Sequence, residues 1–203
     1  MPRRGESLRV LDLFSGLEGW SGPWRDLGHE VYRVEIDPKF PAEHRDILEP
    51  FELPWKPDVV LASPPCTSFS MMSVGKHWTK DNQPKSITAA MGIRLVRTTI
   101  ELISRLKPKW YVIENPRAKL RTFDEMKPFN RLTVTYCQYG EKRMKPTDLW
   151  TNVPLEAKAC KNGASCHVAA PRGSRTGTQG TEKHLSAKIP KALSLAVLEA
   201  VVL

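Results

Sequence analysis

The chain of 203 residues has no apolar run near the roughly 20 residues that a membrane-spanning helix needs. Its basic N-terminus, MPRRGES, has no apolar stretch behind it, so we expect neither a secretory signal nor a membrane partner. The chain also has only four cysteines. Without a signal peptide, these predict free thiols or a metal site in a reducing compartment rather than a disulfide scaffold.

Acidic residues are the minority among the charged side chains. The 22 Asp and Glu face 31 Lys and Arg, which gives a formal net charge of +9. This excess favours a polyanionic partner, because basic side chains that neutralise phosphates release counterions. A basic surface that serves solubility is the alternative. Hydrophobic residues make up 40% of the chain, which indicates a globular protein with one main core.

Strand-like and helix-like segments alternate along the chain. Continuous or alternating apolar residues predict strands at 8–14, 30–36, 58–62, 109–114 and 132–137. Helical spacing of apolar residues predicts a long helix over 86–108, with Ser86 as its cap and Pro108 after its end. The alternation therefore predicts an α/β fold with a parallel sheet and helices on both faces.

The regular pattern is lost after residue 150. Residues 151–184 are rich in Gly, Ser, Thr, Arg and Lys, whereas 185–203 return to an apolar helical pattern. We therefore expect a catalytic and cofactor-binding core over 1–150, a small lobe over 151–184, and a C-terminal helix that returns to the core. No internal repeat is evident in the sequence.

The most distinctive segment is SPPCTSFS at 63–70, directly after the apolar run DVVLA. Two successive prolines end a strand and fix the path of the next residue, because each has a restricted φ and no N–H. Cys66 is therefore expected on a stiff turn at the end of a buried strand, where open α/β sheets place their ligands. The thiol is a candidate nucleophile. The alternative is a small buried side chain on a turn.

Two further segments share this character. LRVLDLFSGLEGW (8–20) runs from an apolar strand into a glycine-containing turn, and WYVIENP (110–116) ends a second apolar strand with Glu114 and Asn115. In order and character, the three segments resemble the motifs Asp-x-Phe-x-Gly-x-Gly-Gly, Pro-Cys-Gln and Glu-Asn-Val of the DNA cytosine-5 methyltransferase family. The resemblance extends from about residue 8 to 150 and resumes near the C-terminus. It implies a Rossmann-like S-adenosylmethionine-dependent methyltransferase sheet with a small irregular recognition lobe.

The family resemblance implies S-adenosyl-L-methionine as the cofactor. Glycines after the first strand let the backbone approach such a ligand, and Glu35, at the end of the second strand, suits both ribose hydroxyls. Glu18 departs from the family pattern, which has glycine there. Solvated surface charge is the alternative for Glu35 and Asp46. The residues expected around the cofactor are Asp12, Phe14, Ser15, Gly16, Gly19, Glu35, Asp46, Ile47 and Pro64.

The resemblance also implies covalent catalysis on cytosine. Cys66 would add to carbon 6 of the ring, and Glu114 would hydrogen-bond the ring nitrogen and the exocyclic amine. YGEKRMKPTDLW (139–150) resembles the family pattern Gln-x-Arg-x-Arg, so Arg143 or Lys145 is expected to hold the cytosine carbonyl or the thiolate. Lysine replaces the second arginine of the pattern, and a solvated basic turn is the alternative. The further substrate-binding candidates are Pro65, Ser70 and Asn115.

The expected substrate is double-stranded DNA, from which the enzyme flips a cytosine so that its carbon 5 reaches both the thiol and the methyl donor. Arg172 and Arg175, in APRGSRTGTQG, are the candidate base readers, because arginine is the commonest bidentate partner of guanine. A flexible surface linker is the alternative for this segment. A recognition lobe this short predicts a short target site. We expect a monomer in the cytoplasm of a bacterial or phage-infected cell.

Three other functions stay open at this point. The first is methylation of cytosine in tRNA, which one branch of the same family performs and which basic charge does not distinguish. The second is nucleic-acid binding without catalysis, although this function would not need Cys66 and Glu114. The third is hydrolysis by a cysteine nucleophile, which needs a histidine beside Cys66; His77 is the nearest in sequence.

Cys160, Cys166 and His167 lie together in ACKNGASCH. They offer three of the four ligands of a structural zinc site, and Cys137 or His184 would have to supply the fourth. The spacing is not one of the usual zinc-finger spacings. We therefore expect no metal there, and instead reduced, partly buried thiols in a small lobe.

Overall fold

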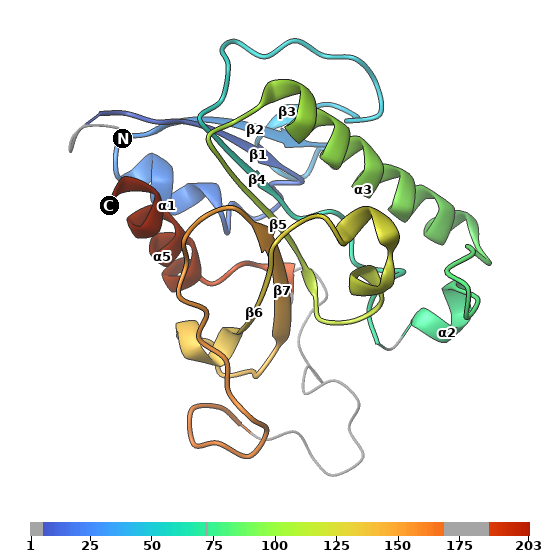
Figure 1. Cartoon of the computed structure of the whole chain (residues 1–203). Coiled ribbons are helices and arrows are strands. Elements are labelled where there is room, and N and C mark those ends of the chain that lie inside the picture. Colours follow the sequence, from blue (N-terminus) through green and yellow to red (C-terminus); the bar gives the residue numbers. More distant parts are fainter. Residues whose placement is uncertain (1–5, 72, 169–186) are drawn as a thin grey trace.

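The computed structural model describes residues 6–71, 73–168 and 187–203. Figure 1 shows a central sheet with helices on its two faces. The elements, in chain order, are β1 (Arg9–Leu13), α1 (Ser21–Asp26), β2 (Glu30–Glu35), β3 (Glu43–His44), β4 (Val59–Ala62), α2 (Val74–His77), α3 (Ile87–Leu106), β5 (Trp110–Pro116), η1 (Lys119–Thr122), η2 (Asp124–Met126), β6 (Arg131–Thr135), η3 (Tyr136–Tyr139), β7 (Pro146–Thr151) and α5 (Lys191–Val202). None of the helices in these ranges is long and apolar enough to cross a membrane.

In the part of the chain that the structure describes, seven strands form one sheet in the order β3-β2-β1-β4-β5-β7-β6. The strands from β3 to β5 are parallel, as the strand-helix alternation predicts. β7 runs antiparallel to both β5 and β6, so the sheet is mixed at that edge rather than parallel throughout. The short connection through η3 explains why β6 and β7 are antiparallel, because parallel neighbours need a longer crossover.

Apolar side chains of the central strands alternate between the two faces of the sheet. In β4, Val60 and Ala62 pack in the core that includes α3, whereas Val59 and Leu61 pack in the core that includes α5. The long helix α3 therefore covers one face, and α1 and α5 cover the other (Figure 1). Burial on both faces explains why these strands are continuous apolar runs.

The predicted strands match β1, β2, β4, β5 and β6, and the predicted long helix matches α3. Ser86 caps α3 as expected, because its Oγ accepts a hydrogen bond from the N–H of Ala89. Lys107 ends this helix in the left-handed conformation, just before Pro108. The C-terminal helix α5 packs against α1 and η3, so the end of the described chain lies beside its beginning. Arg172, Arg175 and His184 lie outside the described residues.

Candidate active site

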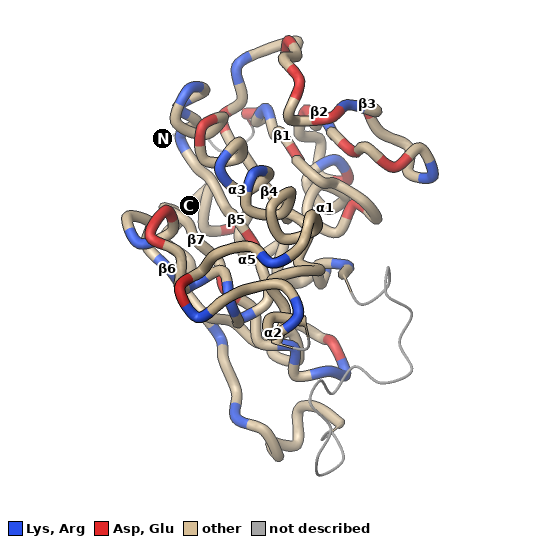
Figure 2. Tube along the Cα trace, turned by 90° about the vertical axis from the view of Figure 1, so that its right-hand side faces the viewer, with Lys and Arg blue, Asp and Glu red and all other residues tan. Residues whose placement is uncertain are grey.

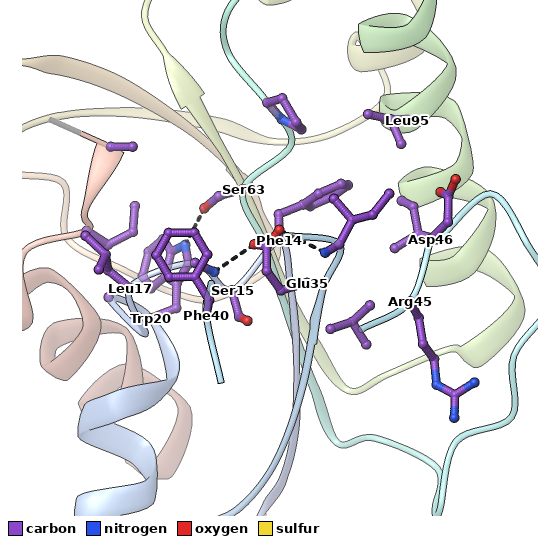
Figure 3. Close-up of a pocket in the computed structure, with 18 of the residues that line it drawn as sticks. Phe14, Ser15, Leu17, Trp20, Glu35, Phe40, Arg45, Asp46, Ser63 and Leu95 are labelled. Atoms are coloured by element: carbon purple, nitrogen blue, oxygen red, sulfur yellow. Dashed lines mark hydrogen bonds between the residues drawn. The ribbon is translucent and has the colours of Figure 1, made fainter. Parts of the chain in front are cut away.

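The sheet order changes direction between β1 and β4, so their carboxyl ends border a crevice. The loops after β1, β2 and β4 surround a cavity of about 450 Å³ there, and Figure 3 shows the side chains that line it. A cavity of this size suits a cofactor-sized ligand. Met91 and Leu95 of α3 and the C-terminal residues 187–189 complete the lining.

Most residues expected around the cofactor meet at this cavity. Two of them do not line it, because Asp12 lies within β1 and Pro64 is buried in the turn after β4. Burial raises the pKa of Asp12 to about 7, although Ser21 and Arg33 oppose the shift. Pro65, expected at the substrate, does line the cavity. The expected cofactor residues that line it are Phe14, Ser15, Gly16, Gly19, Glu35, Asp46 and Ile47.

Glu35 is fixed in place beside the loop after β1. Its Oε2 accepts a hydrogen bond from the N–H of Gly16 at 2.9 Å. Its Oε1 accepts from the N–H groups of Ile36 and Asp37 at 2.9 and 3.1 Å. A carboxylate has about four lone-pair sites, so capacity remains to accept from ligand hydroxyls. Glu35 therefore joins the two loops and still presents an acceptor to the cavity.

The loop after β1 turns sharply through residues with positive φ. Phe14 has a φ of 61°, Gly16 of 42° and Glu18 of 56°. Glu18 stands where the family pattern has glycine, and it adopts a conformation that glycine favours. The Glu18 carboxylate pairs with Arg33 and Arg25 and does not line the cavity. The substitution thus keeps the turn and changes its outer surface.

No sequence motif predicts two of the contacts around the cavity. Trp20 Nε1 donates to Ser63 Oγ at 2.9 Å and joins the loop after β1 to the loop after β4 (Figure 3). Gly19 lies against Ile189, because a Cβ at this glycine would be 2.6 Å from the Ile189 nitrogen. The second contact brings the C-terminal segment to the edge of the cavity, and it requires glycine at position 19.

Cys66 follows β4 in a turn that neighbouring residues hold in place. Ser70 donates its backbone N–H to the Cys66 carbonyl at 3.1 Å, and its hydroxyl lies 2.9 Å from that of Ser73. Asn115 is fully buried, and its Nδ2 donates to the carbonyl of Pro64 at 2.9 Å. Neither Ser70 nor Asn115 lines the cavity. Both residues support the turn that carries the thiol.

Glu114 lies in a buried polar cluster at the end of β5. The residue is only 4% exposed. Tyr136 Oη donates to Glu114 Oε1 at 3.0 Å, and Lys145 Nζ lies 3.7 Å from the same oxygen. Burial and the negative charge of Glu114 raise the pKa of Tyr136 well above its usual value, so its hydroxyl stays a donor. Tyr136 is a member of the site that sequence patterns did not indicate.

The charges of this cluster affect the pKa of the Cys66 thiol. Burial raises its pKa, the charge of Glu114 raises it further, and Lys145 opposes the shift. The thiol is therefore favoured in the free protein, and attack as a thiolate needs a proton acceptor or added positive charge. Arg143 pairs with Glu141 at 3.1 Å. Of the two predicted cations, Lys145 is the one that the structure brings to Glu114.

His77 has a different partner from the one that a cysteine hydrolase needs. Its Nδ1 lies 2.6 Å from Ser86 Oγ, at the start of α3. The ring therefore supports the cap of the long helix. The recorded hydrogen-bond partner of the His77 ring is therefore Ser86 and not Cys66.

The segment after β7 brings Cys160, Cys166 and His167 to Cys137 of η3. One ligand atom from each residue lies within 4.8 Å of the others. Of Cys137 and His184, the two candidates for a fourth ligand, Cys137 is therefore the one that completes this cluster within the described residues.

Comparisons with known proteins show the family of the chain. The family model described as C-5 cytosine-specific DNA methylase matches residues 8–140, which carry the three motifs. A protein of frog virus 3 (isolate Goorha), named "Probable DNA (cytosine-5)-methyltransferase", is 30% identical over 95% of this chain and 99% of its own length. The type II methyltransferase M1.HphI of Haemophilus parahaemolyticus is 28% identical over 67% of this chain and 39% of its own length.

A solved structure shows the same fold. The Entamoeba histolytica methyltransferase EhMeth superposes with a TM-score of 0.51 at 12% sequence identity. The match covers 77% of this chain and 57% of that chain. It confirms the expected Rossmann-like methyltransferase fold. The chain therefore spans nearly all of the frog virus protein but only part of the other two relatives.

Proposed function

Because the chain belongs to the C-5 cytosine-specific DNA methylase family, we propose that it transfers a methyl group from S-adenosyl-L-methionine to carbon 5 of cytosine in DNA. One observation carries the proposal. Pro65 lines the cavity, and the turn that carries Cys66 is hydrogen-bonded to the end of β5 beside Glu114, because Asn115 Nδ2 donates to the Pro64 carbonyl at 2.9 Å. A methyl donor in the cavity and a cytosine at the thiol would therefore meet at one edge of the sheet.

Covalent attack by Cys66 makes carbon 5 reactive in this proposal. The thiolate would add to carbon 6 of cytosine, and the displaced electron pair would make carbon 5 nucleophilic. S-adenosyl-L-methionine, when bound in the cavity, would supply the methyl group that carbon 5 accepts. Glu114 hydrogen-bonds the ring nitrogen and the exocyclic amine, where charge develops. Loss of the proton from carbon 5 then expels the Cys66 thiolate and restores the ring.

The cavity after β1, β2 and β4 is the proposed place for S-adenosyl-L-methionine. Glu35 supports this assignment, because backbone N–H groups fix its carboxylate beside Gly16 and leave acceptor capacity for ribose hydroxyls. Phe14 would lie against the cofactor, and Asp46 and Ile47 would border its adenine. All of these residues line the cavity.

Double-stranded DNA is the proposed substrate of a monomeric enzyme. The net charge of +9 favours phosphate binding, and Figure 2 shows Lys and Arg on several separate segments of the described trace, with Asp and Glu between them. Base flipping would bring the cytosine to Cys66. Arg172 and Arg175 are the proposed base readers, and a few bidentate contacts specify a site of about two to four bases. The proposed setting is the cytoplasm of a bacterial or phage-infected cell.

The test is transfer of labelled methyl groups to duplex DNA and, separately, to tRNA, with the parent protein and with Cys66→Ala. We expect the parent to label duplex DNA, and bisulfite mapping to show a short target sequence. The variant should label neither substrate. Labelling of tRNA alone would assign the protein to the tRNA-methylating branch, and full activity of the variant would exclude covalent catalysis by Cys66.

A further inference from the structure

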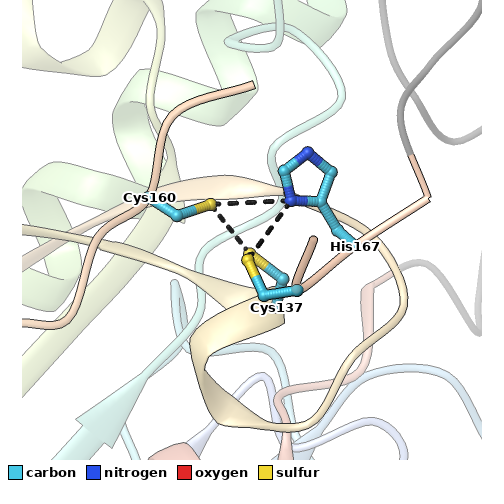
Figure 4. Close-up of side chains that lie close together, drawn as sticks. Cys137, Cys160 and His167 are labelled. Atoms are coloured by element: carbon cyan, nitrogen blue, oxygen red, sulfur yellow. Dashed lines mark hydrogen bonds between the residues drawn. The ribbon is translucent and has the colours of Figure 1, made fainter. Parts of the chain in front are cut away.

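Outside the proposed active site, four metal-binding side chains converge where the segment after β7 passes η3. Cys137 belongs to η3, and Cys160, Cys166 and His167 belong to the later segment. Figure 4 shows the sulfurs of Cys137 and Cys160 and the ring of His167 pointing toward one another. All four cysteines of the chain are free thiols. Methyl transfer, as proposed above, does not use this cluster.

The distances within the cluster fit a tetrahedral metal ion. With bonds of about 2.3 Å to sulfur and 2.0 Å to nitrogen, tetrahedral geometry places two sulfurs about 3.8 Å apart, and sulfur and nitrogen about 3.5 Å apart. The Sγ atoms of Cys166 and Cys137 are 3.7 Å apart. His167 Nδ1 lies 3.4 Å from Cys166 Sγ and 3.7 Å from Cys160 Sγ. The Sγ atoms of Cys137 and Cys160, at 3.0 Å, need to separate slightly.

Neighbouring groups orient these ligands. A histidine that binds a metal through one ring nitrogen usually hydrogen-bonds an oxygen through the other. His167 directs Nδ1 to the sulfurs, and its Nε2 lies 3.5 Å from Asn162 Oδ1. Gln138 Nε2 donates to Cys166 Sγ at 3.1 Å, as an amide would to a thiolate. The cluster therefore has supporting contacts that a chance meeting of thiols would not require.

We propose that Cys137, Cys160, Cys166 and His167 bind one structural zinc ion. Three thiolates and one imidazole form a soft nitrogen and sulfur set that suits zinc. Four protein ligands complete the tetrahedron and leave no position for a catalytic water. The ion therefore stabilises structure and takes no part in methyl transfer.

The ion would fasten the segment 160–167 to the element beside the catalytic carboxylate. η3 begins at Tyr136, which donates to Glu114. The approach of the segment is already guided by backbone, since the N–H of Thr135 donates to the carbonyl of Lys158 at 3.0 Å. Zinc would thus fix the position of segment 160–167, which precedes the proposed base readers in the sequence.

The experiment measures metal in the untagged full-length protein, expressed with added zinc and purified without chelators. Atomic absorption should find one zinc per chain. Replacement by Co²⁺ should produce the thiolate-to-metal charge-transfer absorption and the strong ligand-field bands of tetrahedral cobalt. Protein without zinc, whose reduced form also gives no cobalt bands after addition of Co²⁺, would overturn the proposal.

Single substitutions assign the ligands. Cys160→Ser and Cys166→Ser should each lose the ion, whereas Cys66→Ser, the matched control outside the cluster, should retain it. If a ligand variant fails to fold, the parent still decides, because a chelator should release the ion and accelerate proteolysis within 152–168. Retention of zinc by both ligand variants, its loss in Cys66→Ser, or proteolysis that ignores the chelator would contradict the assignment.

Discussion

Replacement of Tyr136 by phenylalanine tests whether its buried hydroxyl positions Glu114. The two oxygens are 3.0 Å apart, and the residues are 0% and 4% exposed. A hydrogen bond to a charged acceptor contributes about 1.5–3 kcal/mol. The ring itself keeps its place in Tyr136→Phe, including its contact with Lys145 Nζ, 4.5 Å from the ring centroid. The change therefore removes the hydrogen bond to Glu114 and the weaker one that Lys145 Nζ donates to the hydroxyl at 3.5 Å, and it keeps the ring.

The expected result is a loss of turnover with unchanged cofactor binding. If the hydrogen bond holds Glu114 in the orientation that the transition state needs, its loss lowers kcat about 10- to 100-fold, at roughly 1.4 kcal/mol for each factor of ten. Affinity for S-adenosyl-L-methionine should stay the same, because Tyr136 does not line the cavity. Single-turnover methyl transfer and calorimetric titration of the cofactor measure the two quantities.

Tyr139→Phe is the matched control on the same element. Tyr139 is 6% exposed, and its Oη accepts from the N–H of Lys158 at 3.2 Å, away from Glu114. This variant loses a buried hydroxyl and some stability but should keep kcat. An unchanged kcat in Tyr136→Phe would refute the positioning role. An equal fall in both variants would attribute the loss to general loosening of η3.

Three further changes probe the cavity and the strand beneath it. Glu35→Ala should weaken binding of S-adenosyl-L-methionine about 10- to 100-fold in calorimetry, because it removes a charged acceptor; equal affinity would reject its assignment to the ribose. Gly19→Ala should also weaken cofactor binding, since the new Cβ would lie 2.6 Å from the Ile189 nitrogen, whereas Gly75→Ala, with nothing within 4 Å, should bind like the parent. As the pH rises from 3.8 to about 7, the parent should lose stability relative to Asp12→Asn. Over this range the Asp12 carboxyl of the unfolded parent loses its proton, whereas that of the folded parent keeps it. The full difference is about 4 kcal/mol, and denaturation midpoints that stay equally spaced at every pH would contradict it.

The central strands are predictable from sequence because burial on both faces leaves continuous apolar runs, as in VVLA of β4. β7, PTDLWT, gives no such signal, because it begins with proline and carries a charged residue. Asp148 is nevertheless fully buried there, since Arg121 pairs with it at 2.6 Å and Thr133 donates to it at 2.7 Å. These partners come from distant parts of the chain, so only the folded sheet makes Asp148 compatible with a strand.

The candidate site also contains residues that the sequence predicts and residues that it does not. Cys66 and Glu114 are predictable because each follows or ends an apolar strand and matches a short motif. The place of Tyr136 depends on η3, whereas the alternating pattern over 132–137 predicts a strand that continues through it. The C-terminal contact of Ile189 with Gly19 joins the two ends of the chain. Such contacts depend on tertiary packing, which local spacing does not encode.

Attack of Cys66 on cytosine is tested most directly with duplex DNA that carries 5-fluorocytosine at the mapped target. Fluorine at carbon 5 cannot leave as a proton does, so the covalent adduct should persist after methyl transfer. With S-adenosyl-L-methionine present, the parent protein should form a complex that survives denaturing electrophoresis, and Cys66→Ala should form none. A stable complex with Cys66→Ala, or none with a parent that methylates ordinary DNA, would contradict covalent catalysis by Cys66.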